Sequence, residues 1–226
     1  MSDTALPEVI GSRLRAVRTS ANRSLSSVAR EVGISASALS QIESGAMRPS
    51  VKRLVEILSA LGAPVSAVFT DAGLFRRADA EGGVEVSEPL DGVHLALPAR
   101  AASARLGEGV TYRRLAPVVI PGLDLFESVY PPGTSSSPDG GMLVHTGYDC
   151  GSIVRGELTF EFTEGTVRVP AGGSLSFSAT RPHRVVNETA DVAVAVWATV
   201  SVAGNPDTRR ERSRITVTRT KPRNDR

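Results

Sequence analysis

The amino-acid sequence predicts an α+β multidomain protein, with an all-α unit at the N-terminus followed by an all-β unit. Between about residues 9 and 69, apolar residues recur at the three- and four-residue spacing of amphipathic helices. From about residue 110, short runs rich in β-branched and aromatic residues alternate with Pro and Gly turns. The stretch between these regions follows neither period. Two patterns in one chain predict two domains with separate hydrophobic cores.

The helical region is expected to contain five helices. Apolar stripes at residues 10–17, 25–32, 39–42 and 51–61 predict the first four, and a short fifth helix is expected at 65–69. Each of the second to fourth stripes follows a serine suited to cap a helix and precedes a glycine suited to left-handed backbone. These residues are Ser24, Ser35 and Ser50 before the stripes, and Gly33, Gly45 and Gly62 after them.

The second half of the chain contains many short predicted strands. The runs are VTYRRL, LDLFESVY, CGSIVRG, LTFEF, TVRV, SLSFS, HRVVN and VAVAVWATVSV, separated by turns such as PPGTSSSPDGG and PAGG. Such a pattern is typical of a β-barrel or β-sandwich. We therefore divide the chain into a helical domain at 1–72, a linker with room for a strand or two at 73–109, a β domain at 110–203 and a basic tail at 204–226.

Composition and charge argue against a membrane-spanning or secreted protein and favour one that binds a polyanion. No stretch reaches the roughly 18 uncharged apolar residues of a membrane helix, and the first thirty residues lack a secretory signal pattern, so a cytoplasmic protein without membrane contact is expected. The lone cysteine, Cys150, is expected to be a buried thiol. Residues 1–70 carry a net charge of +3, 71–203 carry −6 and 204–226 carry +5. A basic N-terminal part indicates contact with a polyanion.

Residues 24–45, SLSSVAREVGISASALSQIESG, predict two helices joined by a tight turn, an arrangement that lets the second helix enter a DNA major groove. Over residues 9–69 the chain resembles the phage-repressor-like (Xre-type) helix-turn-helix regulators. The resemblance is clearest in VAREVGIS, LSQIESG and SVKRLVEILSALG. It implies that double-stranded operator DNA is the partner.

The resemblance also assigns individual residues to DNA contacts. The positions that face base edges in this family are occupied by Ala36, Ser37, Ser40 and Gln41. Gln41 is the strongest candidate because an amide can bond bidentately to adenine, whereas serines are less selective and alanine can only touch a thymine methyl group. Phosphate contacts are expected from the free amides that begin the second and fourth helices. Side chains expected to join them are Ser35, Ser44, Arg48 and Ser50.

The same resemblance implies one buried ion pair. In the family, an arginine of the first helix pairs with a glutamate at the end of the recognition helix, and Arg18 and Glu43 match these positions. Such a pair holds two helices at a fixed angle. Removing one partner leaves a buried charge unpaired, at a cost of about 3–5 kcal/mol.

Two segments of the β region resemble the motifs of the cupin family, whose fold is a small double-stranded β-helix barrel. They are HTGYDCGSIVRGELTFEF and VPAGGSLSFSATRPHRVVNETADVAVAVW. The first motif has a His-x-His, an acid and a glycine, and Leu143 stands in place of the first histidine. The matching residues are His145, Asp149 and Gly156 in the first motif, and His183 and Asn187 in the second.

This resemblance implies a metal site with two histidines and one carboxylate. His145, Asp149 and His183 could converge on iron, manganese, nickel or zinc. Leu143 removes one ligand, and Asp149 is one methylene shorter than the usual glutamate. The alternative is that the two histidines line the barrel and hydrogen-bond to Asp149 or to a small organic ligand. Tyr148 and Arg181 are further candidates for contact with an anionic effector.

The combined domains predict a transcription regulator that dimerises through its cupin domain and senses a small molecule or a metal there. The alternative is an enzyme, because the same layout resembles the iron-dependent epoxidase of fosfomycin biosynthesis, with His145, Asp149 and His183 as its ligands. Only two lysines, Lys52 and Lys221, are present to hold a phosphonate group. Direct metal sensing is a third possibility and requires no catalysis.

Overall fold

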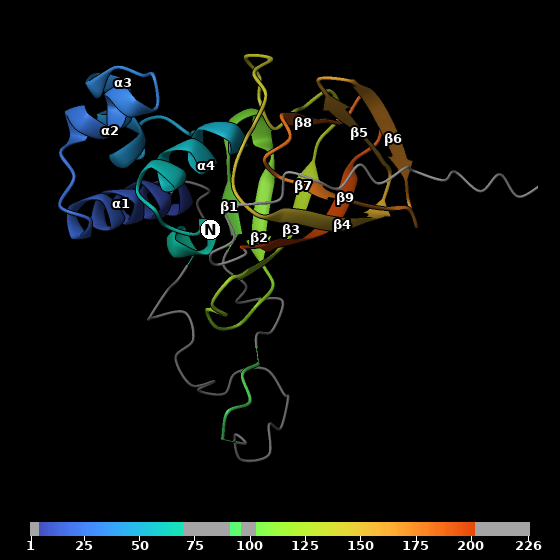
Figure 1. Cartoon of the computed structure of the whole chain (residues 1–226), viewed down its shortest axis with the longest axis horizontal. Coiled ribbons are helices and arrows are strands. Elements are labelled where there is room, and N and C mark those ends of the chain that lie inside the picture. Colours follow the sequence, from blue (N-terminus) through green and yellow to red (C-terminus); the bar gives the residue numbers. More distant parts are fainter. Residues whose placement is uncertain (1–4, 70–90, 96–102, 202–226) are drawn as a thin grey trace, which may run out of the picture.

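The protein consists of a helical domain packed against one side of a β domain (Figure 1). The computed structural model describes residues 5–69, 91–95 and 103–201. The basic tail expected at 204–226 and most of the expected linker lie outside these residues. Within the described residues, none of the helices has both the length and the apolar character needed to cross a bilayer.

The helical domain contains four α-helices and one short 3-10 helix. The predicted fifth helix is 3-10 in type because the amides of Ala67 and Phe69 bond to carbonyls only three residues back, Pro64 and Ser66. The elements are α1 (Ala5–Ser20), α2 (Leu25–Glu31), α3 (Ala36–Glu43), α4 (Val51–Ala60) and η1 (Val65–Val68).

The predicted capping residues lie at the helix ends as expected. The hydroxyls of Ser24, Ser35 and Ser50 accept hydrogen bonds from backbone amides three residues on, at 3.0–3.2 Å. The three glycines that follow α2, α3 and α4 have left-handed backbone, with φ of +68°, +78° and +64°. They are Gly33, Gly45 and Gly62.

The β domain consists of two antiparallel sheets. The larger has the strand order β1-β2-β3-β9-β4-β7 and the smaller β6-β5-β8. All eight predicted runs form strands, and β1 adds a strand within the range assigned to the linker. The strands are β1 (Ser103–Arg105), β2 (Thr111–Arg114), β3 (Leu123–Tyr130), β4 (Tyr148–Arg155), β5 (Glu157–Phe162), β6 (Gly165–Pro170), β7 (Ser174–Ser178), β8 (His183–Val186) and β9 (Ala193–Val200).

Alternation along the strands decides which side chains face the barrel interior. On β3 every second residue is buried, and on β4 Asp149 and Gly151 are buried while Cys150 between them is exposed. The expectation of a buried thiol at Cys150 is therefore wrong, because the two-residue period directs this side chain outward. Gly156, with φ of +73°, makes the turn from β4 to β5.

The two domains are joined by backbone hydrogen bonds at the start of α4. The amide of Lys52 donates to the carbonyl of Ser136 at 3.0 Å, and the amide of Gly107 donates to the carbonyl of Pro49 at 2.9 Å. The rings of Phe69 and Phe126 pack together with centroids 5.3 Å apart. The helix α4 therefore belongs to both the helical core and the contact with the barrel (Figure 1).

Candidate functional site

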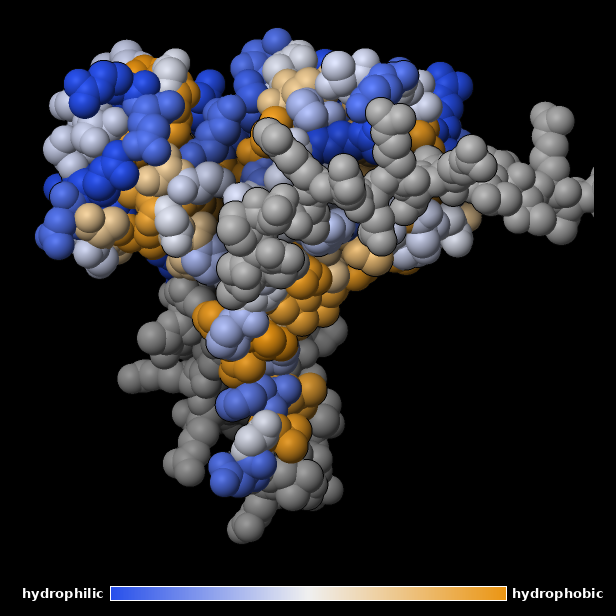
Figure 2. Space-filling model, viewed as in Figure 1, coloured by the Kyte–Doolittle hydropathy of each residue, from blue (hydrophilic) through white to orange (hydrophobic). Residues whose placement is uncertain are grey.

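The recognition helix α3 has one buried and one exposed face. Leu39 and Ile42 are buried against the other helices, which fixes the helix by its apolar side. The residues predicted to contact bases, together with the capping serine, are all exposed. They are Ser35, Ala36, Ser37, Ser40 and Gln41. The surface around α3 is mainly hydrophilic in Figure 2, whereas apolar residues gather on the loop between β2 and β3.

Arg18 and Glu43 form the ion pair between α1 and α3. The guanidinium donates two hydrogen bonds to the carboxylate, Nε to Oε1 at 2.6 Å and Nη2 to Oε2 at 2.8 Å, and the side chains are only 11% and 5% exposed. A third bond runs from Arg18 Nη1 to the carbonyl of Arg23 at 2.9 Å. The hydrogen bond to Glu43 raises the pKa of Arg18, despite its partial burial. This bidentate pair fixes the end of α3 relative to α1.

The residues predicted to contact phosphate fall into two groups. Ser44 and Arg48 are exposed beside α3, but Ser50 is half-buried and its hydroxyl caps α4. The amide of Lys52 is bonded to Ser136 of the barrel, and that of Arg53 to Ser50. These two amides at the start of α4 are not free, contrary to the expectation, because the barrel accepts from one and the capping serine from the other.

Gly11 is a packing position between α1 and α3 that the periodicity did not identify. A Cβ atom at this point of α1 would lie 2.4 Å from the carbonyl oxygen of Ile42 and 2.7 Å from that of Glu43. The two helices therefore approach so closely that only glycine fits. The available signal was a glycine inside an otherwise helical apolar stripe.

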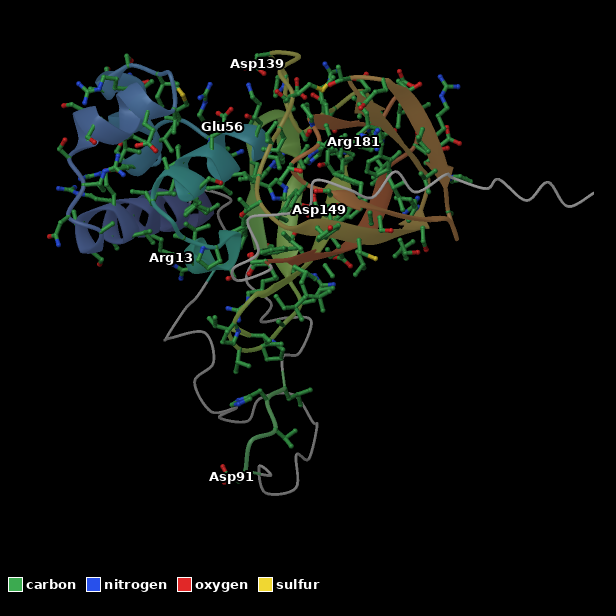
Figure 3. All side chains as sticks on the ribbon, in the orientation of Figure 1. Arg13, Glu56, Asp91, Asp139, Asp149 and Arg181 are labelled. Carbon is green, nitrogen blue, oxygen red and sulfur yellow. The ribbon has the colours of Figure 1, made fainter. Side chains whose placement is uncertain are left out.

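The predicted metal ligands lie together inside the barrel, where Asp149 is labelled in Figure 3. Asp149 Oδ2 is 3.2 Å from His145 Nε2 and 3.7 Å from His183 Nε2. One ligand atom from each of the three residues lies within 4.8 Å of the others. Metal bonds of about 2.1 Å at near-right angles place neighbouring ligand atoms about 3 Å apart. The two separations from Asp149, 3.2 and 3.7 Å, are close to this spacing, so the shorter aspartate side chain still reaches both histidines.

Hydrogen bonds hold the three side chains in the orientation that a metal requires. The Nδ1 of His183 lies 2.8 Å from the carbonyl of Arg181, and the Nδ1 of His145 lies 3.3 Å from that of Thr146. A proton on each Nδ1 leaves the Nε2 lone pairs directed at the site. The hydroxyl of Thr199 donates to Asp149 Oδ1 at 2.8 Å, which leaves Oδ2 for the centre.

The pKa shifts of these groups follow from burial and from the central carboxylate. Burial lowers the pKa of His145, but the hydrogen bond and charge of Asp149 outweigh it, so the net pKa is raised. Burial also lowers the pKa of His183, and there it prevails. Burial raises the pKa of Asp149, but the bond to His145 and other contacts reverse this, so the net pKa is lowered.

Tyr148 and Arg181, the predicted effector contacts, do not line the cavity. Tyr148 is 47% exposed because it is adjacent to the inward-facing Asp149 on β4. The guanidinium of Arg181, a residue labelled in Figure 3, pairs with Glu164 at 3.1 Å and lies over the ring of Phe162. Neither side chain is among the lining residues, and their contact with an effector at the barrel mouth stays a prediction. Only the backbone carbonyl of Arg181 contributes, by its contact with His183.

A cavity of about 90 Å³ lies inside the barrel and is closed on one side by the helical domain. Two buried tyrosines in its wall, Tyr112 and Tyr130, were not predicted, although both are aromatic residues of predicted strands. Their hydroxyls lie 3.3 Å apart, and burial raises the pKa of Tyr112 to about 12. The lining residues are Val51, Val55, Val65, Tyr112, Phe126, Tyr130, Ser136, Leu143, His145, Asp149, Phe160, Phe177, His183, Val185, Trp197 and Thr199.

The charge of the cavity wall is relevant to the alternative that the protein is an enzyme acting on a phosphonate. Among the described residues that line it there is neither lysine nor arginine. The ammonium of Lys52 lies instead at the domain contact, 3.6 Å from Glu56 and 3.3 Å from Asp139. The side chains of this cavity therefore offer no permanent cation for a phosphonate substrate.

Comparison with known proteins supports both domains. A helix-turn-helix model, HTH_3, matches residues 14–68, and a cupin domain model, Cupin_2, matches residues 126–199. The transcriptional regulator ClgR of two Mycobacterium tuberculosis strains is 42% identical over 66 residues, 29% of this chain. The chain spans 59% of the length of these relatives.

One solved structure supports the overall fold of the chain. An HTH_3 family transcriptional regulator from Vibrio cholerae aligns with 89% of this chain and 99% of its own, at 22% identity and a TM-score of 0.62. The Fe(II) form of HppE aligns with 86% of this chain and 100% of its own, at 16% identity and a TM-score of 0.41, a likeness too remote to bear on activity. The chain thus joins a helix-turn-helix domain, matched by the HTH_3 model, to a C-terminal cupin domain, matched by the Cupin_2 model.

Proposed function

We propose that this protein is a sequence-specific, DNA-binding transcription regulator whose cupin domain binds a small molecule or a metal. The observation that carries the proposal is the exposed face of α3, with Ser37, Ser40 and Gln41 open to a major groove while Leu39 and Ile42 anchor the helix. The partner is double-stranded operator DNA, and the place of action is the cytoplasm. Exposed Ser44 and Arg48 lie beside α3 and are placed to contact phosphates.

Gln41→Ala tests the DNA contact. The substitution is expected to weaken binding to the preferred operator by about 1–3 kcal/mol and to relax base choice at one position, because it removes a bidentate amide contact. Fluorescence anisotropy against the DNA upstream of the gene, and against single-base variants, measures both effects. Ser59→Ala, a change at an exposed position on α4, is the control and should leave the operator affinity and the base preference unchanged. Equal affinity and equal base preference for Gln41→Ala and the unmodified chain would contradict the assignment.

The barrel is proposed to accept a divalent metal at His145, Asp149 and His183. A bound ion would supply a Lewis-acidic centre with open positions, and the three side chains would hold it. His183→Ala is expected to abolish uptake of Zn²⁺ or Mn²⁺, measured by calorimetry and metal analysis. Thr199→Val is expected to weaken the affinity for the metal about 10–100-fold, because the hydrogen bond from the Thr199 hydroxyl that orients Asp149 is lost. Uptake by His183→Ala equal to that of the unmodified chain would place the metal elsewhere.

A homodimer formed through the cupin domain is proposed as the DNA-binding form, because helix-turn-helix proteins bind two-fold operators as dimers. The outer face of the larger sheet supports this. Val200 of β9 lies between Leu123 of β3 and Tyr148 of β4, and Val200 and Tyr148 are 40% and 47% exposed. A second copy that covers this apolar face would remove it from water.

Val200→Glu is expected to convert the dimer to a monomer in light scattering, because the interface would have to bury an unpaired charge. Val167→Glu is the matched control, since Val167 is 42% exposed on β6 of the other sheet. A dimer that survives Val200→Glu but not Val167→Glu would assign the interface to the smaller sheet.

A further inference from the structure

Part of the cavity wall comes from the DNA-binding domain. Val51 and Val55, one turn apart on α4, line the cavity together with Val65 of η1. The remaining lining residues belong to the barrel. A molecule that fills the cavity therefore touches both domains at once, with no intermediate element between it and α4.

The helix α4 is attached to the barrel beside these two valines. The amide of Lys52 donates to Ser136 O at 3.0 Å, and Ser136 itself lines the cavity. The amide of Gly107 donates to Pro49 O at 2.9 Å just before the helix. These two interdomain bonds report whether α4 is docked on the barrel.

A second set of contacts connects α4 to the recognition helix. Arg53, on the turn of α4 that carries Val51 and Val55, donates from Nη1 to the carbonyl of Val32 at 2.6 Å. Val32 lies in the turn between α2 and α3. Arg53 thus connects α4 by one hydrogen bond to the turn that precedes α3, and α3 in turn is fixed to α1 by Arg18 and Glu43.

The chemistry of the wall defines the class of occupant. Most lining side chains are apolar, and the lining residues include neither lysine nor arginine, so without a metal at His145, Asp149 and His183 the wall offers an anion no permanent cation. The hydroxyls of Tyr112 and Tyr130 lie at 3.3 Å, beyond the usual range for such a pair, and each can bond an oxygen of a ligand. An uncharged small molecule with an apolar body and one hydroxyl or carbonyl group fits this wall.

We propose that such an uncharged molecule is detected by α4 directly and locks the helix-turn-helix domain onto the barrel. A ligand that touches both domains binds the docked arrangement more tightly than any arrangement in which α4 has moved away, by the free energy of its contacts with Val51, Val55 and Val65. This inference rests on the proposed function only in taking the cupin domain as the effector site.

Hydrogen exchange of the Lys52 and Gly107 amides, measured by NMR on the full chain with phenol as the probe, tests the proposal. Phenol at ten times its dissociation constant is expected to slow exchange of both amides about tenfold, since undocking must then release the ligand. Val55→Ala removes part of the α4 contact and should reduce the slowing to about threefold or less. Val154→Ala, the matched control, makes the same change at an exposed site on β4. In this variant phenol should still slow exchange of the two amides about tenfold.

Two outcomes overturn the inference. If phenol leaves the signals of Tyr112 and Trp197 unmoved, the cavity does not accept this class of molecule. If phenol binds but Lys52 and Gly107 exchange at unchanged rates, α4 does not respond to the occupant. Operator binding measured in the same samples distinguishes failure of the proposed DNA-binding function from failure of the proposed response of α4. Absence of specific DNA binding would contradict the proposed function as a regulator but would not change the hydrogen-exchange result.

Discussion

Arg18→Ala is expected to lower the free energy of unfolding of the helical domain by about 3–5 kcal/mol. Glu43 is 5% exposed and accepts both of its side-chain hydrogen bonds from Arg18, so the substitution leaves a buried carboxylate unpaired. Urea denaturation followed by circular dichroism at 222 nm reports on the helices. The domain has only a small core, so a loss of this size should leave much of it unfolded near body temperature.

Two further variants isolate the role of burial. Glu31→Ala breaks the Arg23–Glu31 pair, whose side chains are 32% and 50% exposed, and should cost no more than about 1 kcal/mol. The double variant Arg18→Met with Glu43→Leu replaces both charges with apolar groups and should recover much of the lost stability. A cost for Arg18→Ala as small as that for Glu31→Ala would show that water reaches Glu43 and that the pair does not fix α3.

Gly11→Ala is expected to destabilise the helical domain by about 1–3 kcal/mol and to weaken operator binding as well. In an exposed helix the same change is stabilising by about 1 kcal/mol, because alanine is the better helix former. Here the new Cβ would lie 2.4 Å from Ile42 O, and backbone cannot move aside as a flexible side chain does. The recognition helix must therefore shift away from α1.

Arg15→Ala, an exposed change on the same helix, is the control for Gly11→Ala and should alter stability by less than about 0.5 kcal/mol. Thermal melts and anisotropy titrations on both variants compare stability with DNA affinity. If Gly11→Ala raises the melting temperature and keeps full operator affinity, the close approach of α1 and α3 is not required.

The features that sequence predicts best are those determined by neighbouring residues. The capping serines and the left-handed glycines of α2, α3 and α4 act within a few residues, so Ser35 and Gly33 identify a helix boundary without knowledge of the fold. The strands were predicted for the same reason, since alternation is local. The convergence of His145, Asp149 and His183 followed from the motif resemblance, because only the closed barrel brings β8 of the smaller sheet close to Asp149 on β4 of the larger sheet.

The features that sequence could not predict depend on packing between distant segments. The residues near Ser50 and Lys52 do not indicate that the barrel packs against the start of α4. The carbonyl that accepts from the Lys52 amide belongs to Ser136, which is 84 residues away in sequence. The burial of Cys150 was predicted wrongly, because a two-residue period fixes the alternation along a strand but not which half of the residues faces inward. Tyr112 and Tyr130 read as ordinary strand residues, and only the closed barrel shows them in the cavity wall.

The central claim is that α3 presents Gln41 and its neighbours to the bases of a specific operator. The most direct measurement is a titration of the full chain, at about 0.15 M salt, with DNA from upstream of its gene and with a scrambled fragment of equal length and composition. Binding to the upstream DNA should be at least about 10³-fold tighter. Equal affinity for the two fragments, with the same dependence on salt, would mean that the protein contacts only phosphates, and the assignment of α3 as a recognition helix would be wrong.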